Sequence, residues 1–153
     1  TSKELLIRYL NNKGLSDLDI KTYCSKFYDS YWGTFNLSSV VNHYEIFTSM
    51  KIYSKKLMIY LSNDSKLKAT ELLVITPDHH GLFSQISGLV ASSGYDIVSA
   101  KIITRSDGYA LDTFFIQNKG PKLSRIPTFT TPKLNNLELK IENHMTKTKK
   151  PNN

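Results

Sequence analysis

Residues 70–83 read Thr-Glu-Leu-Leu-Val-Ile-Thr-Pro-Asp-His-His-Gly-Leu-Phe, and this stretch decides the fold. Its first seven residues are typical of a buried strand, and Pro77 ends the run because proline cannot donate to a strand ladder. Apolar residues then recur at helical spacing, until Gly94 supplies the left-handed position that commonly ends a helix. The apolar face of this helix, which we expect in the core, consists of Leu82, Phe83, Ile86, Leu89 and Val90.

Two further strands are predicted after this helix, over residues 95–104 and 109–117. The residues between them, Arg105-Ser106-Asp107-Gly108, include the Asp-Gly pair that favours a tight hairpin. We expect Asp107 to serve that turn and Asp112 to lie on the polar face of the second strand. A strand, a helix and a two-stranded hairpin in this order predict an antiparallel α+β unit.

The last part of the chain changes character. Prolines interrupt residues 118–133, which predicts a loop, and an apolar stripe predicts a short helix over 134–145. Residues 146–153 lack a pattern, and we expect a disordered tail there. Of the formal net charge of +7, residues 118–153 contribute +6, because they hold eight Lys and Arg against two Glu. We therefore expect a solvated basic tail rather than a nucleic-acid surface.

Residues 1–55 are predicted to form a helical segment that precedes the strands. Apolar residues recur there at helical spacing in three runs, the second of which extends from Ser16 to Tyr31 before Gly33 interrupts. Ser16 suits a helix start, because its side chain can cap exposed backbone N–H groups. Cys24 lies on the apolar stripe of the second run, where we expect a small core residue rather than a nucleophile.

Composition and length exclude several classes of protein. The chain has 153 residues, enough for one core, and its 22% of charged residues argue against wholesale disorder. A single cysteine excludes an intramolecular disulfide and a multi-cysteine zinc site. No apolar run approaches the ~18 residues of a membrane span, and the first residues lack the order of a signal peptide. We therefore expect a cytoplasmic protein that does not engage a membrane.

Two motifs resemble those of a known family. The turn at 76–83, Thr-Pro-Asp-His-His-Gly-Leu-Phe, is similar to the Pro-Asp-x-x-Gly-Leu-Phe turn of ACT domains, small regulatory modules that often bind amino acids. The run at 103–114, Ile-Thr-Arg-Ser-Asp-Gly-Tyr-Ala-Leu-Asp-Thr-Phe, resembles the first ACT domain of the bacterial PII uridylyltransferase/uridylyl-removing enzymes, which respond to glutamine. Residues 69–71, the pair Tyr31-Trp32 and His43 fit that domain and its preceding connector. The resemblance implies a ferredoxin-like βαββαβ fold, with helices on one face of an antiparallel sheet.

The resemblance also implies that several elements of the family's proteins are not found in this sequence. The last ACT strand, the second ACT domain and the catalytic motifs have no counterpart, so we expect a regulatory segment of a nucleotidyltransferase family. The family's enzymes would use Mg²⁺ and UTP, whereas we expect no catalytic residue and no cofactor in this chain. Residues 57–61 predict an extra strand within an ACT core spanning 56–117. We expect this strand to pair antiparallel with 70–76, because an open edge there invites aggregation.

The turn at 77–81 suits an amino acid for reasons that need no family. Exposed N–H groups at a helix start favour a carboxylate, and Asp78 can either receive an ammonium group or cap its own helix. Gly81 permits close backbone approach. With the start of the next strand added, as the resemblance implies, the candidate ligand-binding residues are Asp78, His79, His80, Gly81, Leu82, Phe83, Asp96 and Ile97.

Two of these positions depart from the family's pattern. His80 stands where the family usually has proline, and Asp96 stands where asparagine is common. An ionised carboxylate only accepts hydrogen bonds and repels a ligand carboxylate, so we expect Asp96 to reduce or abolish glutamine affinity. The adjacent His79 and His80 predict a surface turn rather than a metal site, because no further ligands accompany them.

The resemblance suggests partners as well. ACT modules generally work in pairs with ligand at the shared boundary, which implies a homodimer, and a monomer with half a site stays open. A separate catalytic chain and the PII protein are further expected partners, whereas nucleic acid is not. Three alternatives to amino-acid sensing stay open: a ligand-free remnant, a protein-interaction module, and a binder of acidic partners through the basic tail.

Overall fold

The computed structural model describes residues 1–120 and 132–148 of the chain. Residues 121–131 of the predicted loop and residues 149–153 of the predicted tail lie outside this part. The elements in chain order are α1 (Ser2–Asn12), α2 (Asp17–Cys24), α3 (Asp29–Thr34), α4 (Leu37–Ile52), β1 (Met58–Asp64), β2 (Ala69–Pro77), α5 (Leu82–Ser92), β3 (Tyr95–Thr104), β4 (Tyr109–Asn118) and α6 (Pro132–Thr148).

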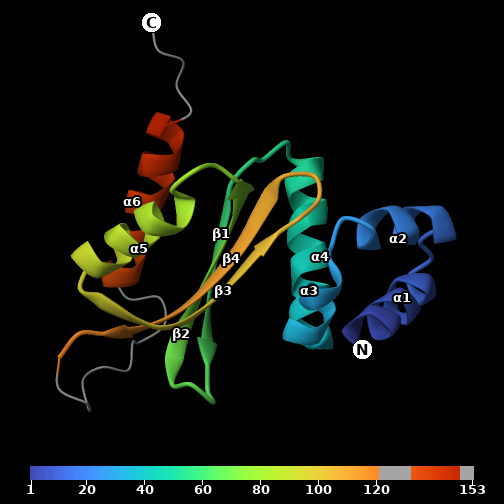
Figure 1. The fold of residues 1–153 in the computed structure, drawn as a ribbon, viewed down its shortest axis with the longest axis horizontal. Helices are drawn as coiled ribbons and strands as arrows, with labels where there is room; N and C mark the ends of the chain where they lie inside the picture. The colour runs from blue at the N-terminus through green and yellow to red at the C-terminus, as the bar shows by residue number, and fades with distance from the viewer. Residues whose placement is uncertain (121–131, 149–153) are drawn as a thin grey trace, which may run out of the picture.

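The four strands form one antiparallel sheet in the order β1-β2-β4-β3 (Figure 1). The hairpin between β3 and β4 forms where the Asp-Gly pair predicts it, and Gly108 has a positive φ of 88°. β1 lies antiparallel to β2, with Ile59 opposite Val74, which confirms the predicted pairing. The arrangement is an α+β, ferredoxin-like one in which β1 lies at the edge of the sheet beside β2.

β1 is longer than the sequence predicts. It continues into the polar stretch because Ser62 lies opposite Glu71 and its hydroxyl donates to that carboxylate at 2.8 Å. Asp64 then closes the turn by accepting hydrogen bonds from the backbone N–H groups of Lys66 and Leu67, at 3.0 and 2.9 Å. Polar cross-strand pairs thus extend a strand that has no apolar pattern at this end.

Helices α5 and α6 cover one face of the sheet (Figure 1). Phe83 corrects the predicted helix face: it is 44% exposed, because it is rotated away from Leu82, Ile86 and Val90, which face the sheet. Strand residues that alternate along the sheet complete this core. The buried cluster consists of Leu72, Val74, Leu82, Ile86, Val90, Tyr95, Ala110, Phe114, Ile116, Leu134, Leu137, Ile141 and Met145.

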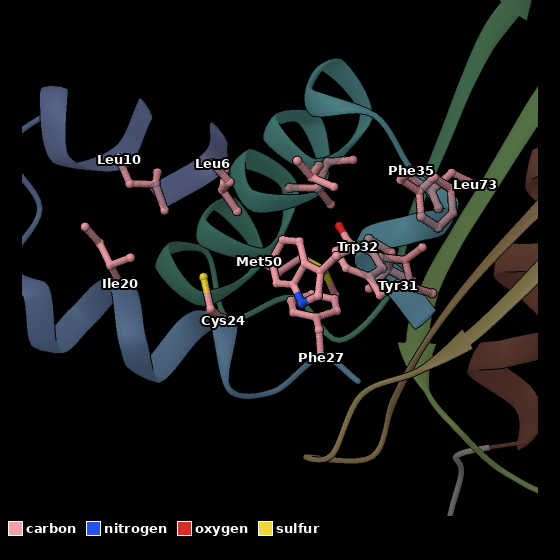
Figure 2. Packing of buried hydrophobic residues seen from close by; sticks show 14 residues of the cluster. Leu6, Leu10, Ile20, Cys24, Phe27, Tyr31, Trp32, Phe35, Met50 and Leu73 are labelled. Carbon is pink, nitrogen blue, oxygen red and sulfur yellow. The ribbon is translucent and has the colours of Figure 1, made fainter. Parts of the chain in front are cut away.

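The N-terminal helices pack on the opposite face. A largely aromatic cluster joins them to the strands, and Figure 2 shows Phe35 of this cluster beside Leu73 of β2. Within the cluster the rings of Phe27 and Tyr31 stack, with their centroids 4.1 Å apart. Cys24 is buried there, as expected of a small core residue. The sheet therefore separates two cores, one on each face.

The second predicted helix is divided in two. Ser16 caps α2 as predicted, its hydroxyl accepting from the N–H of the third helical residue at 3.1 Å. The helix ends at Cys24, and α3 begins at Asp29 after a turn that places Phe27 in the aromatic cluster. Gly33 lies within α3 and does not interrupt a helix. Burial of one aromatic ring thus overrides a continuous helical pattern.

Helix α6 is also longer than predicted. It spans Pro132–Thr148, where the sequence predicts 134–145. Proline suits the first helical position, because an N–H group there would have no partner within the helix. Near the other end, the Thr146 hydroxyl donates to the carbonyl of Glu142 at 2.8 Å. In the described ranges, no helix combines the length and the apolar character that crossing a bilayer requires.

Candidate functional site

The predicted ligand-binding turn joins β2 to α5. Gly81 is the N-cap of α5 and has a φ of 80°, a conformation that favours glycine. No side chain caps this helix, so Asp78 does not take the capping role that the sequence left open. The Asp78 side chain is exposed, and its backbone N–H donates to the carbonyl of Gly108 at 2.8 Å. The helix start therefore presents uncapped N–H groups near an exposed carboxylate.

The other residues of the turn divide between surface and core. His80 is exposed, and Nδ1 of the half-buried His79 lies 3.2 Å from the His80 carbonyl oxygen. Leu82 is buried beneath the turn, whereas the ring of Phe83 lies over Phe114 with centroids 5.6 Å apart. Among residues 1–120 and 132–148, no three His, Cys, Asp or Glu side chains form a group that could hold a metal ion.

Asp96 and Ile97 lie at the other end of the sheet. Pro77 is opposite Tyr109 on β4, whereas Asp96 is opposite Gln117, eight residues further along the same strand. At about 3.4 Å per residue, Tyr109 and Gln117 are roughly 27 Å apart along β4. One copy of the chain therefore does not bring the two parts of the predicted site together. The cause is the strand–helix–strand connection, because α5 carries the chain back along the sheet before β3 begins.

β3 is an edge strand of the sheet. A bulge interrupts its register with β4, and the apolar side chains of Val98 and Ile102 are exposed. In an antiparallel pairing of two such strands, the start of one β3 lies against the end of the other. Asp96 of a second copy would then approach the sheet end that carries Asp78.

Asp112 lies on the face of β4 that packs against α5. It is only 2% exposed, contrary to the predicted polar face, and its Oδ1 has no hydrogen-bond partner in the described part of the chain. Burial, and then the negative charge of Asp78, raises the pKa of Asp112 to about 7. Side chains along a strand alternate between its two faces, so Asp112 shares a face with the buried Ala110 and Phe114. This alternation in the sequence could have predicted its burial.

The β3–β4 hairpin connects the turn to the N-terminal helices. Arg105 donates from Nε to Oδ1 of Asp107 at 3.0 Å and from Nη2 to the second oxygen. This pairing lowers the pKa of Asp107 and gives the residue a partner besides the turn. The guanidinium also lies 3.7 Å from the ring centroid of Phe47 on α4. The N–H of Ser106 donates to the carbonyl of Lys26, at 2.8 Å.

His43 contributes to the packing of the N-terminal helices. Its Nδ1 lies 2.6 Å from the hydroxyl oxygen of Tyr31, and the side chain is 2% exposed. Burial, with a smaller contribution from Lys101, lowers the pKa of His43 to about 4. The imidazole is therefore neutral at physiological pH and links α4 to α3.

Comparison with known proteins finds relatives of the chain. The chain is 38% identical over 104 residues to the bifunctional uridylyltransferase/uridylyl-removing enzyme of Gluconobacter oxydans, covering 68% of the chain and 11% of that enzyme. The same enzyme of Rhodospirillum rubrum is 37% identical over 95 residues, which are 62% of the chain and 10% of the enzyme. The chain is homologous to one segment of these enzymes.

A third relative extends the homology along the chain. The bifunctional uridylyltransferase/uridylyl-removing enzyme of Azospirillum brasilense is 30% identical over 148 residues, which cover 90% of the chain and 16% of that enzyme. The homology to uridylyltransferase/uridylyl-removing enzymes therefore reaches both the N-terminal helices and the sheet. The chain spans between 10% and 16% of the length of these three relatives. No protein-family model matches the chain.

Proposed function

We propose that the chain is a regulatory amino-acid-binding module with a ligand of the glutamine type. The observation that carries this proposal is the uncapped start of α5 beside the exposed carboxylate of Asp78. The N–H groups would receive the ligand's carboxylate, and Asp78 would receive its ammonium group. The ACT-like turn and the homology to uridylyltransferase/uridylyl-removing enzymes support a regulatory role.

We expect the site to be completed by a second copy of the chain. Asp78 and Asp96 lie at opposite ends of one sheet, and antiparallel pairing of two β3 edges reduces that separation. The exposed side chains of Val98 and Ile102 support such pairing, because association would remove them from water. A homodimer is thus part of the proposal. A catalytic chain and the PII protein, in a cytoplasmic setting, are the partners through which binding would act.

Asp96 sets the expected affinity. Its carboxylate would repel the carboxylate of glutamine, whereas an asparagine could both donate and accept. We therefore expect the chain to bind glutamine weakly or not at all, and the Asp96→Asn variant to bind it at least tenfold more tightly. Micromolar glutamine binding by the unchanged chain would contradict this role of Asp96.

The test is an amide NMR titration of the full chain and of Asp96→Asn with L-glutamine, with other amino acids as controls. The proposal expects saturable shifts in residues 77–83 and 95–98 of the variant, and a mass of two copies by light scattering. Asp78→Asn in the Asp96→Asn background should remove the response, and the exposed Asp17→Asn should not. Absence of shifts at millimolar ligand in every variant would leave a folded, ligand-free remnant.

A further inference from the structure

A cavity of about 650 Å³ lies between the N-terminal helices and the β3–β4 hairpin. Its walls come from α2, from the second half of α4 with the segment that follows, and from the hairpin. It includes no residue of the turn at 77–83. The volume falls in the range of about 300–1,000 Å³ that is typical of small-molecule sites.

The cavity carries an excess of positive charge. Four of its lining residues are lysines, namely Lys26, Lys51, Lys55 and Lys56. None of the four forms a salt bridge within the described ranges. Asp19 is the single carboxylate on the wall, and Arg105, which also lines the cavity, has its charge balanced by Asp107. Four lysines against one carboxylate favour an anionic ligand.

Two buried polar groups on the wall have hydrogen-bonding capacity to spare. The hydroxyl of Tyr23 is buried and has no hydrogen-bond partner among the described residues. Leaving such a group without a partner is unfavourable, so a hydrogen bond from this hydroxyl to a ligand atom would favour binding. Arg105 is 6% exposed, and Asp107 takes hydrogen bonds from two of its nitrogens, which leaves further N–H donors of the guanidinium.

Aromatic rings form another part of the wall. Tyr23 and Tyr44 meet edge to face with centroids 5.0 Å apart, and Phe47 and Tyr109 meet in the same way at 6.1 Å. All four residues line the cavity. Flat ring faces and edges of this kind favour a planar group packed against them. The wall therefore combines a charged part and a part suited to a ring.

We propose that this cavity binds a small organic phosphate that carries a planar ring. A phosphate bears a charge of about −1.5 to −2 near neutral pH and so matches several ammonium groups better than one carboxylate does. The Tyr23 hydroxyl and the guanidinium of Arg105 supply directed hydrogen bonds, and the tyrosine and phenylalanine rings pack on the ligand's ring. The proposal goes beyond amino-acid binding and uses none of the residues of that site.

The test titrates the full chain, at fixed ionic strength, with three probes followed by amide NMR. Adenosine 5′-monophosphate carries both a ring and a phosphate, whereas adenosine and inorganic phosphate each carry one of the two. We expect saturable shifts in α2, α4 and the hairpin with the monophosphate, at an affinity at least tenfold above either half. No shift at about 10 mM monophosphate, or an affinity equal to that of inorganic phosphate, overturns the proposal.

Variants separate this site from unspecific charge. The exposed Lys51 and Lys55 can be changed together to glutamine without disturbing the core, and we expect at least tenfold weaker binding. Lys21→Gln, on the exposed side of α2 and outside the cavity, is the matched control and should bind like the unchanged chain. Equal weakening by Lys21→Gln overturns the proposal. Tyr23→Phe should weaken binding without lowering stability, since it removes an unpartnered hydroxyl.

Discussion

The two faces of the sheet bury titratable side chains of opposite kinds. On the side of the N-terminal helices, His43 has Tyr31 as a partner, and Arg105 pairs with Asp107. On the side of α5 and α6, Asp112 is buried with one oxygen unpartnered and has a raised pKa. Both His43 and Asp112 make stability depend on pH, because burial lowers the pKa of the imidazole and raises that of the carboxyl group. The two faces are therefore expected to respond to a change of pH in opposite directions.

The helices also differ in whether a side chain caps their N-terminus. Asn36 caps α4 by accepting from the N–H of Ser39 at 3.0 Å, and Ser16 caps α2. No side chain caps α5, where Gly81 takes the N-cap position. α1 and α3 likewise begin without a side-chain cap. The first N–H groups of an uncapped helix are left to water or to other groups, and the proposed amino-acid site uses those of α5.

The largest expected effect tests whether the two faces unfold as one unit. Phe114→Ala removes a fully buried ring from the α5–α6 side and should cost about 3–5 kcal/mol in the free energy of unfolding. Trp32, the one tryptophan, lies in the opposite core, so its fluorescence follows that side during urea unfolding. We expect fluorescence and far-UV circular dichroism to shift together in the variant.

The control for this change is Phe83→Ala, which removes the exposed ring that lies over Phe114. It should cost about 1 kcal/mol or less, because nearly half of this residue is already exposed to water. A Trp32 transition that stays at its original urea concentration in Phe114→Ala would show that the two cores unfold separately.

The next effect concerns acid and the N-terminal side. The pKa of His43 is about 4 in the folded chain and 6.5 when unperturbed, so the unfolded chain takes up the proton first. Stability from this group is present above pH 6.5 and is lost as the pH falls towards 4, by about 3 kcal/mol in total. Urea unfolding of His43→Gln between pH 7 and pH 4.5 should show a flatter decline. A decline as steep as in the unchanged chain would contradict this role.

An effect of similar size and opposite sign is expected on the other face. The pKa of Asp112 is raised to about 7 from an unperturbed 3.8, so the folded chain holds its proton longer than the unfolded chain. Stability from this group is fully present below pH 3.8 and is lost as the pH rises through about 7. The stability of Asp112→Asn relative to the unchanged chain should therefore increase by about 2–3 kcal/mol between pH 5 and pH 8.

Chemical denaturation at the two pH values measures this difference. Asp29→Asn, an exposed change at the start of α3, is the matched control and should show no comparable pH dependence. An Asp112→Asn curve parallel to that of the unchanged chain would mean that the carboxyl group is solvated, and the contrast between the two faces would disappear.

The smallest effect concerns the helix starts. Asn36→Ala removes the cap of α4 and should cost about 1 kcal/mol, since one backbone N–H loses its partner. Ser84→Ala, in the exposed first turn of the uncapped α5, should change stability by less than about 0.5 kcal/mol. Equal costs by thermal unfolding would show that α5 has a capping interaction after all.

Local features of the fold could be predicted from the sequence. The strand before Pro77, the hairpin at Gly108 and the pairing of β1 with β2 all follow from turn chemistry and apolar pattern. The break after Cys24 could not, because it depends on where the ring of Phe27 packs in the tertiary structure. Such a preference outweighs helical spacing only once the partner rings are in place.

The candidate site, like the fold, could be predicted from the sequence only in part. The turn at 77–81 is visible in the sequence, and the strand–helix–strand order already implies that Asp96 starts at the opposite end of the sheet. The basic cavity was not predictable, because its walls come from α2, the end of α4 and the hairpin, which are far apart in the chain. The pairing of Arg105 with Asp107 was not predictable either, because the tight turn already accounted for the aspartate at that position.

One tight turn has a consequence for communication between the two proposed sites. The carbonyl of Gly108 accepts from Asp78, and the N–H of Ser106 donates to Lys26 at the cavity wall. The hairpin is therefore a shared support, and a ligand that shifts it from one side shifts it for the other. If both sites bind, thermodynamic reciprocity requires each ligand to change the other's affinity by the same factor. The module would then combine two chemical inputs into a single response.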